Sequence, residues 1–194
     1  IVAEVETQVS STLLMNKVKG NIKVNYIDPP GFGPTKQSTL EDLAFLYTIE
    51  NDESLWELSQ VQTPFSKDVL QTYLETAHND IKLLKQLRLV ITSKTNEPIG
   101  FIDLFDFDSH NKHAGVSIVL TEAYRGKGYG KDALSVLMDY SFNELGLHQL
   151  YSNVLEDNSV SIRLFESLGF EKVGLKKRWR FYKGRYKNEY LFQF

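Results

Sequence analysis

A glycine-rich stretch constrains the fold of this chain more than any other feature. It reads RGKGYGK over residues 125–131, with a glycine at every second position from 126 to 130 and three cations around them. The residues before it, 113–120, alternate as a strand does, and those after it, 133–145, repeat apolar residues at helical spacing. A strand, a turn and a helix in this order leave free backbone N–H groups at the helix start, where the helix dipole also favours negative charge. The stretch therefore predicts an anion site, because bare glycine backbone lets a phosphate approach closely.

Two better-known phosphate-binding loops do not match this stretch. A P-loop requires the pattern G-x-x-x-x-G-K-[ST], but Gly130-Lys131 is followed here by Asp132. Arg125 stands where the first glycine of that pattern should be. A dinucleotide fingerprint requires its third glycine where Lys131 stands. A glycine-rich connection without a ligand is the alternative, although three glycines and three cations at one helix start favour the anion site.

Apolar periodicity along the rest of the chain predicts a mixed sheet with helices on both faces. The expected elements, in chain order, are a strand at 21–27, a turn-rich loop at 28–34, a helix that begins at Ser38 or Thr39, a helix from Ser66 to about Leu87, strands at 87–93, 98–107 and 113–120, a helix over 133–145, a strand at 147–155, a short helix from Asn158 or Ser159 to Gly169, and two final strands that turn at Lys183 and Gly184. This order predicts an α+β fold with one central mixed sheet of six to seven strands. We expect a single domain over residues 21–194 and an N-terminal extension, residues 1–20, that is either non-native or disordered.

Composition excludes several classes of site and partner. The chain has no cysteine, which rules out disulfides, thiolate metal sites and a cysteine nucleophile, and which fits the cytoplasmic location that we expect. No apolar run approaches the roughly 20 residues that span a bilayer, and residues 1–20 lack the pattern of a signal peptide. The net charge of -3 speaks against a general nucleic-acid binder. We therefore expect neither a membrane nor a nucleic acid as partner.

The histidines do not predict a metal site. His110 and His113 lie on an expected turn between strands, not four residues apart on a helix. No third ligand is organised around them, so we predict no bound metal.

The charge is distributed unevenly along the chain. Residues 39–57 contain six acids and no Lys or Arg, whereas residues 171–187 contain eight basic residues and one acid. Two solvated faces would explain this gradient. The alternative is an acidic site for a cationic substrate together with a basic region for an anionic cofactor.

The glycine stretch resembles a known loop. RGKGYG is similar to the R/Q-x-x-G-x-G/A loop of the GNAT N-acetyltransferases, which holds the diphosphate of acetyl-CoA. The segment EDNSVSIRLFESLGFEKVG, residues 156–174, resembles the next segment of that family, and residues 99–194 resemble the spermidine and the ribosomal-protein N-terminal acetyltransferases. Residues 39–98 fit only in layout, and residues 1–38 fit poorly. The resemblance implies the GNAT fold, acetyl-CoA as cosubstrate, direct attack by an amine in a ternary complex, and a homo-oligomer, either a dimer or a larger ring.

The resemblance also implies which residues contact the cosubstrate. Val119 and Leu120 correspond to the strand that bonds the pantetheine and offers an N–H to the thioester oxygen. Asn158 corresponds to a pantetheine contact, and its alternative role is a plain helix cap. The expected cofactor-binding residues are Val119, Leu120, Arg125, Gly126, Lys127, Gly128, Tyr129, Gly130, Lys131 and Asn158.

The general acid is the point at which this chain departs from the family. Phe165 stands where many relatives carry a tyrosine that protonates the leaving thiolate, and Phe cannot donate a proton. Ser161 is one substitute, since N-x-x-S at 158–161 resembles the N-terminal acetyltransferase branch; its alternative role is a hydroxyl bonded to the preceding turn. A second possibility is a nearby tyrosine, namely Tyr124, Tyr151 or Tyr182. The third is that the thiolate leaves without help from the protein.

A general base is also needed, because an amine with a lysine-like pKa is neutral in only about 10⁻³ to 10⁻⁴ of molecules at pH 7. The candidates are Asp103, Asp106 and Glu122, with His110 and His113 behind them. Strand alternation predicts that Asp103 and Asp106 face opposite sides. Gly115 stands where many relatives carry a glutamate, so that group is missing here. Our catalytic prediction comprises Ser161, Asp103 and Glu122.

In the family, the first two helices and the last hairpin hold the acceptor. The residues predicted to bind it here are Glu50, Glu53, Trp56, Glu57, Asp106 and Tyr182. An acidic pocket with aromatic walls suits a protonated polyamine or a related small amine. A peptide N-terminus is also a cationic amine, so an N-terminal acetyltransferase is an alternative. A CoA-binding regulatory module that has lost catalysis is the rival from another class, motivated by Phe165 and Gly115.

Overall fold

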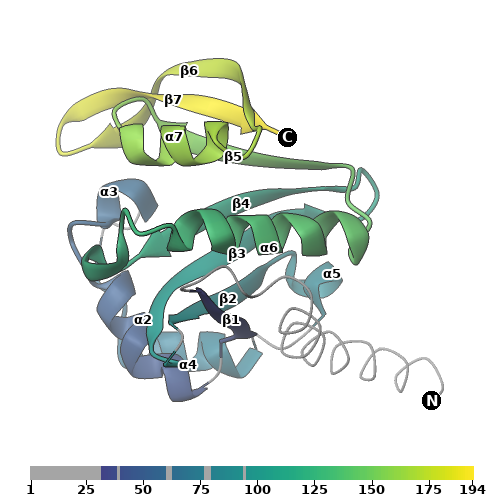
Figure 1. Cartoon of the computed structure of the whole chain (residues 1–194). Helices are drawn as coiled ribbons and strands as arrows, with labels where there is room; N and C mark the ends of the chain where they lie inside the picture. The colour runs from purple at the N-terminus through teal and green to yellow at the C-terminus, as the bar shows by residue number, and fades with distance from the viewer. Residues whose placement is uncertain (1–31, 39, 60–62, 77–79, 94) are drawn as a thin grey trace.

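A seven-stranded sheet runs through the molecule (Figure 1). The computed structural model describes residues 32–194 except positions 39, 60–62, 77–79 and 94, so the strand expected at 21–27 and the extension expected at 1–20 lie outside the described residues. The strands are β1 (Phe32–Gln37), β2 (Leu87–Ser93), β3 (Pro98–Asp108), β4 (His113–Leu120), β5 (Gln149–Leu155), β6 (Glu171–Tyr182) and β7 (Arg185–Gln193), in the sheet order β1-β2-β3-β4-β5-β7-β6. Neighbours pair antiparallel except β4 and β5, which pair parallel. The predicted mixed sheet is confirmed.

Helical segments connect these strands and cover both faces. They are η1 (Leu40–Asp42), α2 (Leu43–Glu50), α3 (Trp56–Ser59), α4 (Lys67–Thr76), α5 (Ile81–Leu84), η2 (Glu122–Tyr124), α6 (Tyr129–Asn143) and α7 (Ser159–Glu166). Among the residues that the structure describes, no helix is long and apolar enough to cross a membrane.

Side-chain alternation along the strands divides the core into two clusters. On β2, Leu89 and Ile91 belong to a large cluster that α6 and α7 cover, whereas Val90 belongs to a smaller cluster beneath α2 and α4. We call these the α6 face and the α2 face of the sheet. On β5, Leu150 packs on the α6 face, so its neighbour Tyr151 points to the α2 face.

Three local expectations were wrong. The helix expected from Ser66 to Leu87 is interrupted, because Asp80 has extended backbone and its carboxylate accepts a hydrogen bond from Lys82 N, which starts α5 anew. Lys85 then ends α5 in the left-handed conformation. The loop expected up to residue 34 is strand from Phe32 onward, and Pro34 is tolerated there because β1 is an edge strand. The short helix α3 was not expected at all.

Candidate active site

The glycine-rich loop forms the start of α6. Gly126 and Gly128 have φ angles of 71° and 91°, and a Cβ added to either would meet no atom within 4 Å. The first helical N–H to find an acceptor within α6 is that of Asp132, which donates to Gly128 O at 3.1 Å. The preceding N–H groups therefore have no intrahelical partner, and the space beside Gly126 and Gly128 is open. This arrangement fits a diphosphate, as the sequence predicted for an anion site.

Side chains fix the loop against the rest of the molecule. Arg125 Nε donates to Leu120 O at 2.9 Å, which ties the loop to the end of β4. The rings of Tyr124 and Tyr129 meet edge to face at 5.5 Å, and Lys127 Nζ lies 5.7 Å from the Tyr124 ring centroid. Lys131 is exposed in the first turn of α6. Arg125 thus anchors the loop, while Lys127 and Lys131 provide positive charge beside it.

The parallel strands β4 and β5 separate next to this loop. They pair at three positions only, and the last of these joins Gly115 to Tyr151. One residue further, the hydroxyl of Ser152 bridges to Val116 O at 2.9 Å. Beyond that point the two strands run apart toward the side of Figure 1 where α3 and the first turn of α6 lie. Among the described strands, none pairs with this edge of β4 there, and we call it the open edge.

The main-chain N–H and C=O groups of successive residues on a strand point to opposite sides, and this alternation shows which groups of β4 line the open edge. Thr121 N donates to Ile99 O on β3, so Thr121 and every second residue before it bond to β3. Val119, two residues before Thr121, is one of these residues, so its main-chain N–H and C=O are directed to β3 rather than to the open edge. Leu120 and Ile118 present their main chain to the open edge instead. Of the two residues predicted from position alone, Leu120 fits a pantetheine contact and Val119 does not, while Ile118 was missed.

Helix α7 carries the next predicted group of residues. Asn158 Oδ1 accepts a hydrogen bond from Ser161 N at 3.1 Å, so the expected cap exists, and the cap leaves the amide nitrogen of Asn158 available to a ligand. Within the described chain, the Ser161 hydroxyl makes no hydrogen bond, unlike the hydroxyls of Ser135 and Ser141, which bond back onto α6. Phe165 is a core residue: it is 2% exposed and its ring lies 5.0 Å from that of Phe170.

Two of the three candidate tyrosines already donate to carboxylates. Tyr124 Oη donates to Glu97 at 2.8 Å, and this hydrogen bond raises the pKa of Tyr124. Tyr151 Oη donates to Asp106 at 3.1 Å; burial first, and then this bond, raise the pKa of Tyr151 to about 12. Both phenols are therefore weaker acids than an ordinary tyrosine. Tyr182 lies at the end of β6, with Lys183 Nζ 5.2 Å from its ring centroid.

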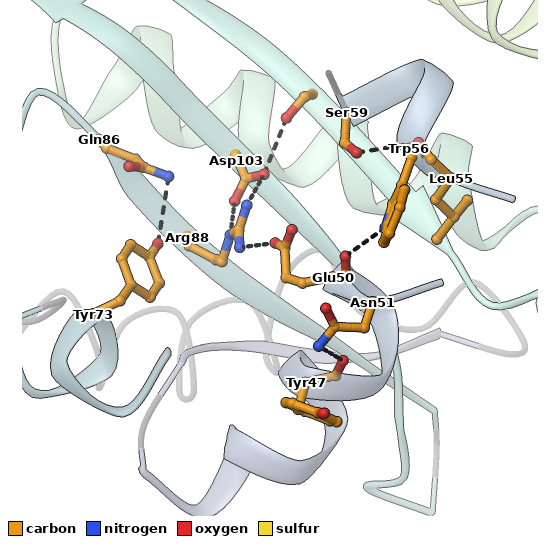
Figure 2. A network of polar contacts seen from close by, with 11 residues as sticks. Tyr47, Glu50, Asn51, Leu55, Trp56, Ser59, Tyr73, Gln86, Arg88 and Asp103 are labelled. Atoms are coloured by element: carbon orange, nitrogen blue, oxygen red, sulfur yellow. Dashed lines mark hydrogen bonds and ion pairs between the residues drawn. The ribbon is translucent and has the colours of Figure 1, made fainter. Parts of the chain in front are cut away.

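Asp103, predicted as a catalytic residue, belongs to a buried ion-pair network between α2 and the sheet (Figure 2). Arg88 Nε and Nη2 bond its two carboxylate oxygens at 2.7 and 3.2 Å, and the Ser117 hydroxyl donates to it at 3.0 Å. Arg88 Nη1 also bonds Glu50 at 2.6 Å. Burial alone would lower the pKa of Arg88, but the charge and hydrogen bonds of Asp103 outweigh it and raise that pKa. Asp103 is thus engaged with a permanent cation, an arrangement that does not favour its predicted role as a general base.

Glu122, the third predicted catalytic residue, lies apart from the other two. It opens η2 beyond the end of β4, where its carbonyl accepts from Arg125 N. Asp103 faces Ser117, five residues before Glu122, so the two acids are separated along the chain direction of β4 by up to about 16 Å, at about 3.3 Å per residue. The structure therefore does not bring Glu122 together with Asp103.

The first helices and the last hairpin do meet, as expected for an acceptor site. Glu57 on α3 bonds Lys187 on β7 at 2.6 Å, and Arg180 on β6 donates to the carbonyl of Glu57 at 3.0 Å. The indole of Trp56 donates to the carbonyl of Glu50 at 3.0 Å. Glu53 is exposed on the loop between α2 and α3. Glu50, Trp56 and Glu57 are thus linked by contacts around α3, with Glu53 in the loop beside them. Asp106 lies apart from them, toward the end of β3, where it contacts Tyr151, and Tyr182 lies at the end of β6, past Arg180.

Folding neutralises part of the charge gradient through ion pairs. Lys187 bonds Asp157 as well as Glu57, each at 2.6 Å. The buried carboxylate of Glu189 on β7 accepts from Lys176 and Arg180, each at 3.1 Å. Three basic residues of the hairpin are therefore paired with acids: Glu57 belongs to the acidic stretch at 39–57, Asp157 follows β5, and Glu189 lies in the hairpin itself. In the described part of the chain, no group of His, Asp and Glu is arranged to hold a metal ion.

Comparisons with known proteins agree with this geometry. A sequence profile described as "Acetyltransferase (GNAT) domain" matches residues 36–171. The chain is 31% identical over 147 residues to an uncharacterised prophage-derived N-acetyltransferase, YokL, of Bacillus subtilis, covering 75% of this chain and 80% of that protein. It is 26% identical over 148 residues to a spermidine N(1)-acetyltransferase of Vibrio cholerae, covering 76% and 83%.

Solved structures share the fold. Spermidine N-acetyltransferase from Vibrio cholerae in complex with CoA and spermine superposes with a TM-score of 0.76 at 23% identity, covering 82% of this chain and 93% of that one. A dodecameric structure of spermidine N-acetyltransferase from the same organism superposes with a TM-score of 0.70 at 25% identity, covering 82% and 91%.

Proposed function

The chain belongs to the GNAT family of acetyl-CoA-dependent N-acetyltransferases, and we propose that its acceptor is a small primary amine of the polyamine class, which attacks in a ternary complex. The observation that carries the cosubstrate part of this proposal is the set of N–H groups without an intrahelical partner at the start of α6, next to the open edge of β4. Acetyl-CoA supplies a thioester carbonyl to the site. The protein's share of the rate comes from placing two reactants together, which is worth up to about 7–11 kcal/mol in ideal cases.

Different residues along the open edge bind the cosubstrate and handle the protons. Backbone N–H groups of residues 126–131 bind the diphosphate, with Lys127 and Lys131 adding positive charge. The main chain of Ile118 and Leu120 bonds the pantetheine and donates toward the thioester oxygen. The Asn158 amide contributes a further donor beside its capping role. Ser161, whose hydroxyl is not committed to the helix, is the candidate that protonates the leaving sulfur.

Two features support a polyamine acceptor. Relatives at 26% and 28% identity are named spermidine N(1)-acetyltransferases. Glu53 and Asp106 are exposed acids on the acceptor side and can each meet an ammonium group, while Trp56 can pack against methylenes. A peptide N-terminus is the second candidate, favoured by Ser161 in the N-x-x-S pattern.

A thiol-release assay tests the acceptor. We expect turnover with spermidine and spermine, and kcat/KM at least about tenfold lower for N-terminal peptides and aminosugars, since a tenfold preference needs only about 1.4 kcal/mol. A higher kcat/KM for peptides would overturn the polyamine assignment in favour of the N-terminal one. Tight CoA binding with no turnover on any amine would overturn the enzymatic proposal.

Substitution of Phe165 separates an active enzyme from a CoA-binding module that has lost catalysis. We expect Phe165→Tyr to leave kcat within about tenfold of the parent and to lower the free energy of unfolding by about 1–3 kcal/mol, because the new hydroxyl enters an aromatic core. Assays of both proteins and urea denaturation check this. Activity that is present only in the variant would support the module.

We also propose that residues 21–194 form one domain and that the protein is a homo-oligomer. A relative at 25% identity is dodecameric, which supports self-association. The edge strand β6 and the adjoining β7 expose apolar side chains that a second copy could cover, namely Val173, Leu175, Trp179, Phe181 and Tyr186. Light scattering on the purified protein measures the assembly directly.

A further inference from the structure

Strand β3 contains an extra residue at the level where β4 and β5 begin to part. Phe105 faces Gly115 and Asp108 faces His113, so three steps along β3 oppose two along β4. This is a β-bulge, a feature that re-aims side chains near functional sites. Asp106, within the bulge, has a φ of 49°. A left-handed aspartate costs of order 1 kcal/mol or more, and residues strained in this way cluster at functional sites.

The bulge redirects the Asp106 carboxylate. Regular alternation would place Asp106 on the face opposite Asp103, and that expectation was wrong. Asp106 Oδ2 instead accepts a hydrogen bond from Tyr151 Oη at 3.1 Å, and Tyr151 points to the α2 face. Asp106 is nevertheless exposed, so one side of its carboxylate is held by Tyr151 while the rest is accessible.

Aromatic rings hold Tyr151 in this position. The ring of Phe105 lies over Gly115, where a Cβ would come within 2.3 Å of it, so only glycine fits beneath. Phe105 meets the Tyr151 ring edge to face at 5.6 Å, and His113 meets it at 6.2 Å. The glycine at position 115 is thus explained: it makes room for the ring that supports Tyr151.

The Tyr151–Asp106 pair lies at the inner end of the open edge. Tyr151 is opposite Gly115, and Val116 is the next residue of β4. From Val116 to Leu120 the open edge is about 13 Å long at roughly 3.3 Å per residue, a length that suits an extended pantetheine arm whose diphosphate lies at α6. The reacting carbonyl then falls near Val116, beside Asp106. The other two acids considered as bases do not fit, since Asp103 is paired with Arg88 and Glu122 lies at the far end.

We propose that Asp106 is the general base for the acceptor amine and that Tyr151 is its positioning residue; this rests on the proposed function. The Asp106 carboxylate takes one proton from the ammonium group, and the freed nitrogen lone pair forms the C–N bond to the thioester carbon. The C–S bond breaks, with its electron pair leaving on sulfur. The second proton lost from nitrogen neutralises that thiolate, so atoms and charge balance.

Asp106→Asn tests the proposal. With the best amine found for the parent, we expect kcat/KM to fall about 100-fold at pH 7. The deficit should shrink as the pH is raised to 9, because more of the amine is then neutral without a base. CoA affinity in calorimetry should be unchanged. In ultraviolet titration, Tyr151 should ionise at lower pH than in the parent, because the variant lacks the carboxylate that now helps to raise its pKa.

Two further variants separate catalysis from folding. Asp106→Gly suits the left-handed backbone, so it should keep or increase stability and still lose the same rate. Asp108→Asn is the matched control, since that carboxylate bonds only the turn at His110 and Asn111 among the described residues, and its rate should equal that of the parent. Parental rates in Asp106→Gly, or a deficit that does not change with pH, would overturn the role of Asp106. A parent that acetylates no amine would instead overturn the proposed function.

Discussion

A Gly126→Ala/Gly128→Ala variant is expected to lose about 100-fold or more in CoA affinity and still to fold, since two charge-assisted hydrogen bonds are together worth about 3 kcal/mol or more. Both glycines have positive φ, and space around each is open to 4 Å. The added methyl groups therefore clash with nothing in the protein. They strain the backbone that presents the N–H groups and enter the space beside it, so the expected loss is in CoA affinity.

A matched variant isolates that effect. Gly146 and Gly184 also have positive φ, 62° and 80°, with no atom within 4 Å of an added Cβ. Gly146→Ala/Gly184→Ala should therefore cost similar strain, about 1–2 kcal/mol per residue, without touching the loop. Calorimetry with CoA and urea denaturation of both double variants compare the two sites. Equal CoA affinity in the two variants would contradict the loop assignment.

The loop could be predicted because its determinants are local. The glycines, the cations and the change from strand to helix periodicity all lie within residues 113–145, and the structure has β4, η2 and α6 there. The prediction from local sequence failed where an apolar spacing and a helix-capping residue indicated different structures. The apolar spacing of residues 66–87 favours one helix, but the Asp80 carboxylate captures a backbone N–H and restarts the helix as α5.

The reacting centre could not be predicted in the same way, because it depends on pairings between distant segments. The open edge exists because β5 leaves β4 after Tyr151, and only the hydrogen-bond phase with β3 assigns Leu120 and Ile118 to it. The apolar and polar alternation of the sequence does not reveal the β-bulge in β3. This bulge turns Asp106 toward Tyr151, 45 residues away along the chain. The sequence places Glu57 in an acidic stretch, but its ion pair with Lys187, 130 residues later in the chain, depends on the fold.

Arg88→Met is expected to lower the free energy of unfolding by about 3–5 kcal/mol, the usual cost of removing one partner from a buried ion pair. The side chains of Glu50 and Asp103 are only 16% and 10% exposed, and Arg88 bonds both. Its guanidinium also lies over the rings of Tyr73 and Phe101, at 5.6 and 5.5 Å. Methionine keeps part of that packing but leaves two carboxylates without their cation. The midpoint of urea denaturation measures the loss.

The charge origin of this loss is checked by removing the carboxylates as well. Arg88→Met combined with Glu50→Gln and Asp103→Asn leaves no ionised group in the network, so most of the lost stability should return. Arg88→Lys keeps the charge but cannot bond Glu50 and both oxygens of Asp103 at once, so it should lie between the parent and Arg88→Met. A loss below about 1 kcal/mol in Arg88→Met would mean that the network behaves as a surface pair. In that case water would reach Asp103, and its exclusion as the base would no longer hold.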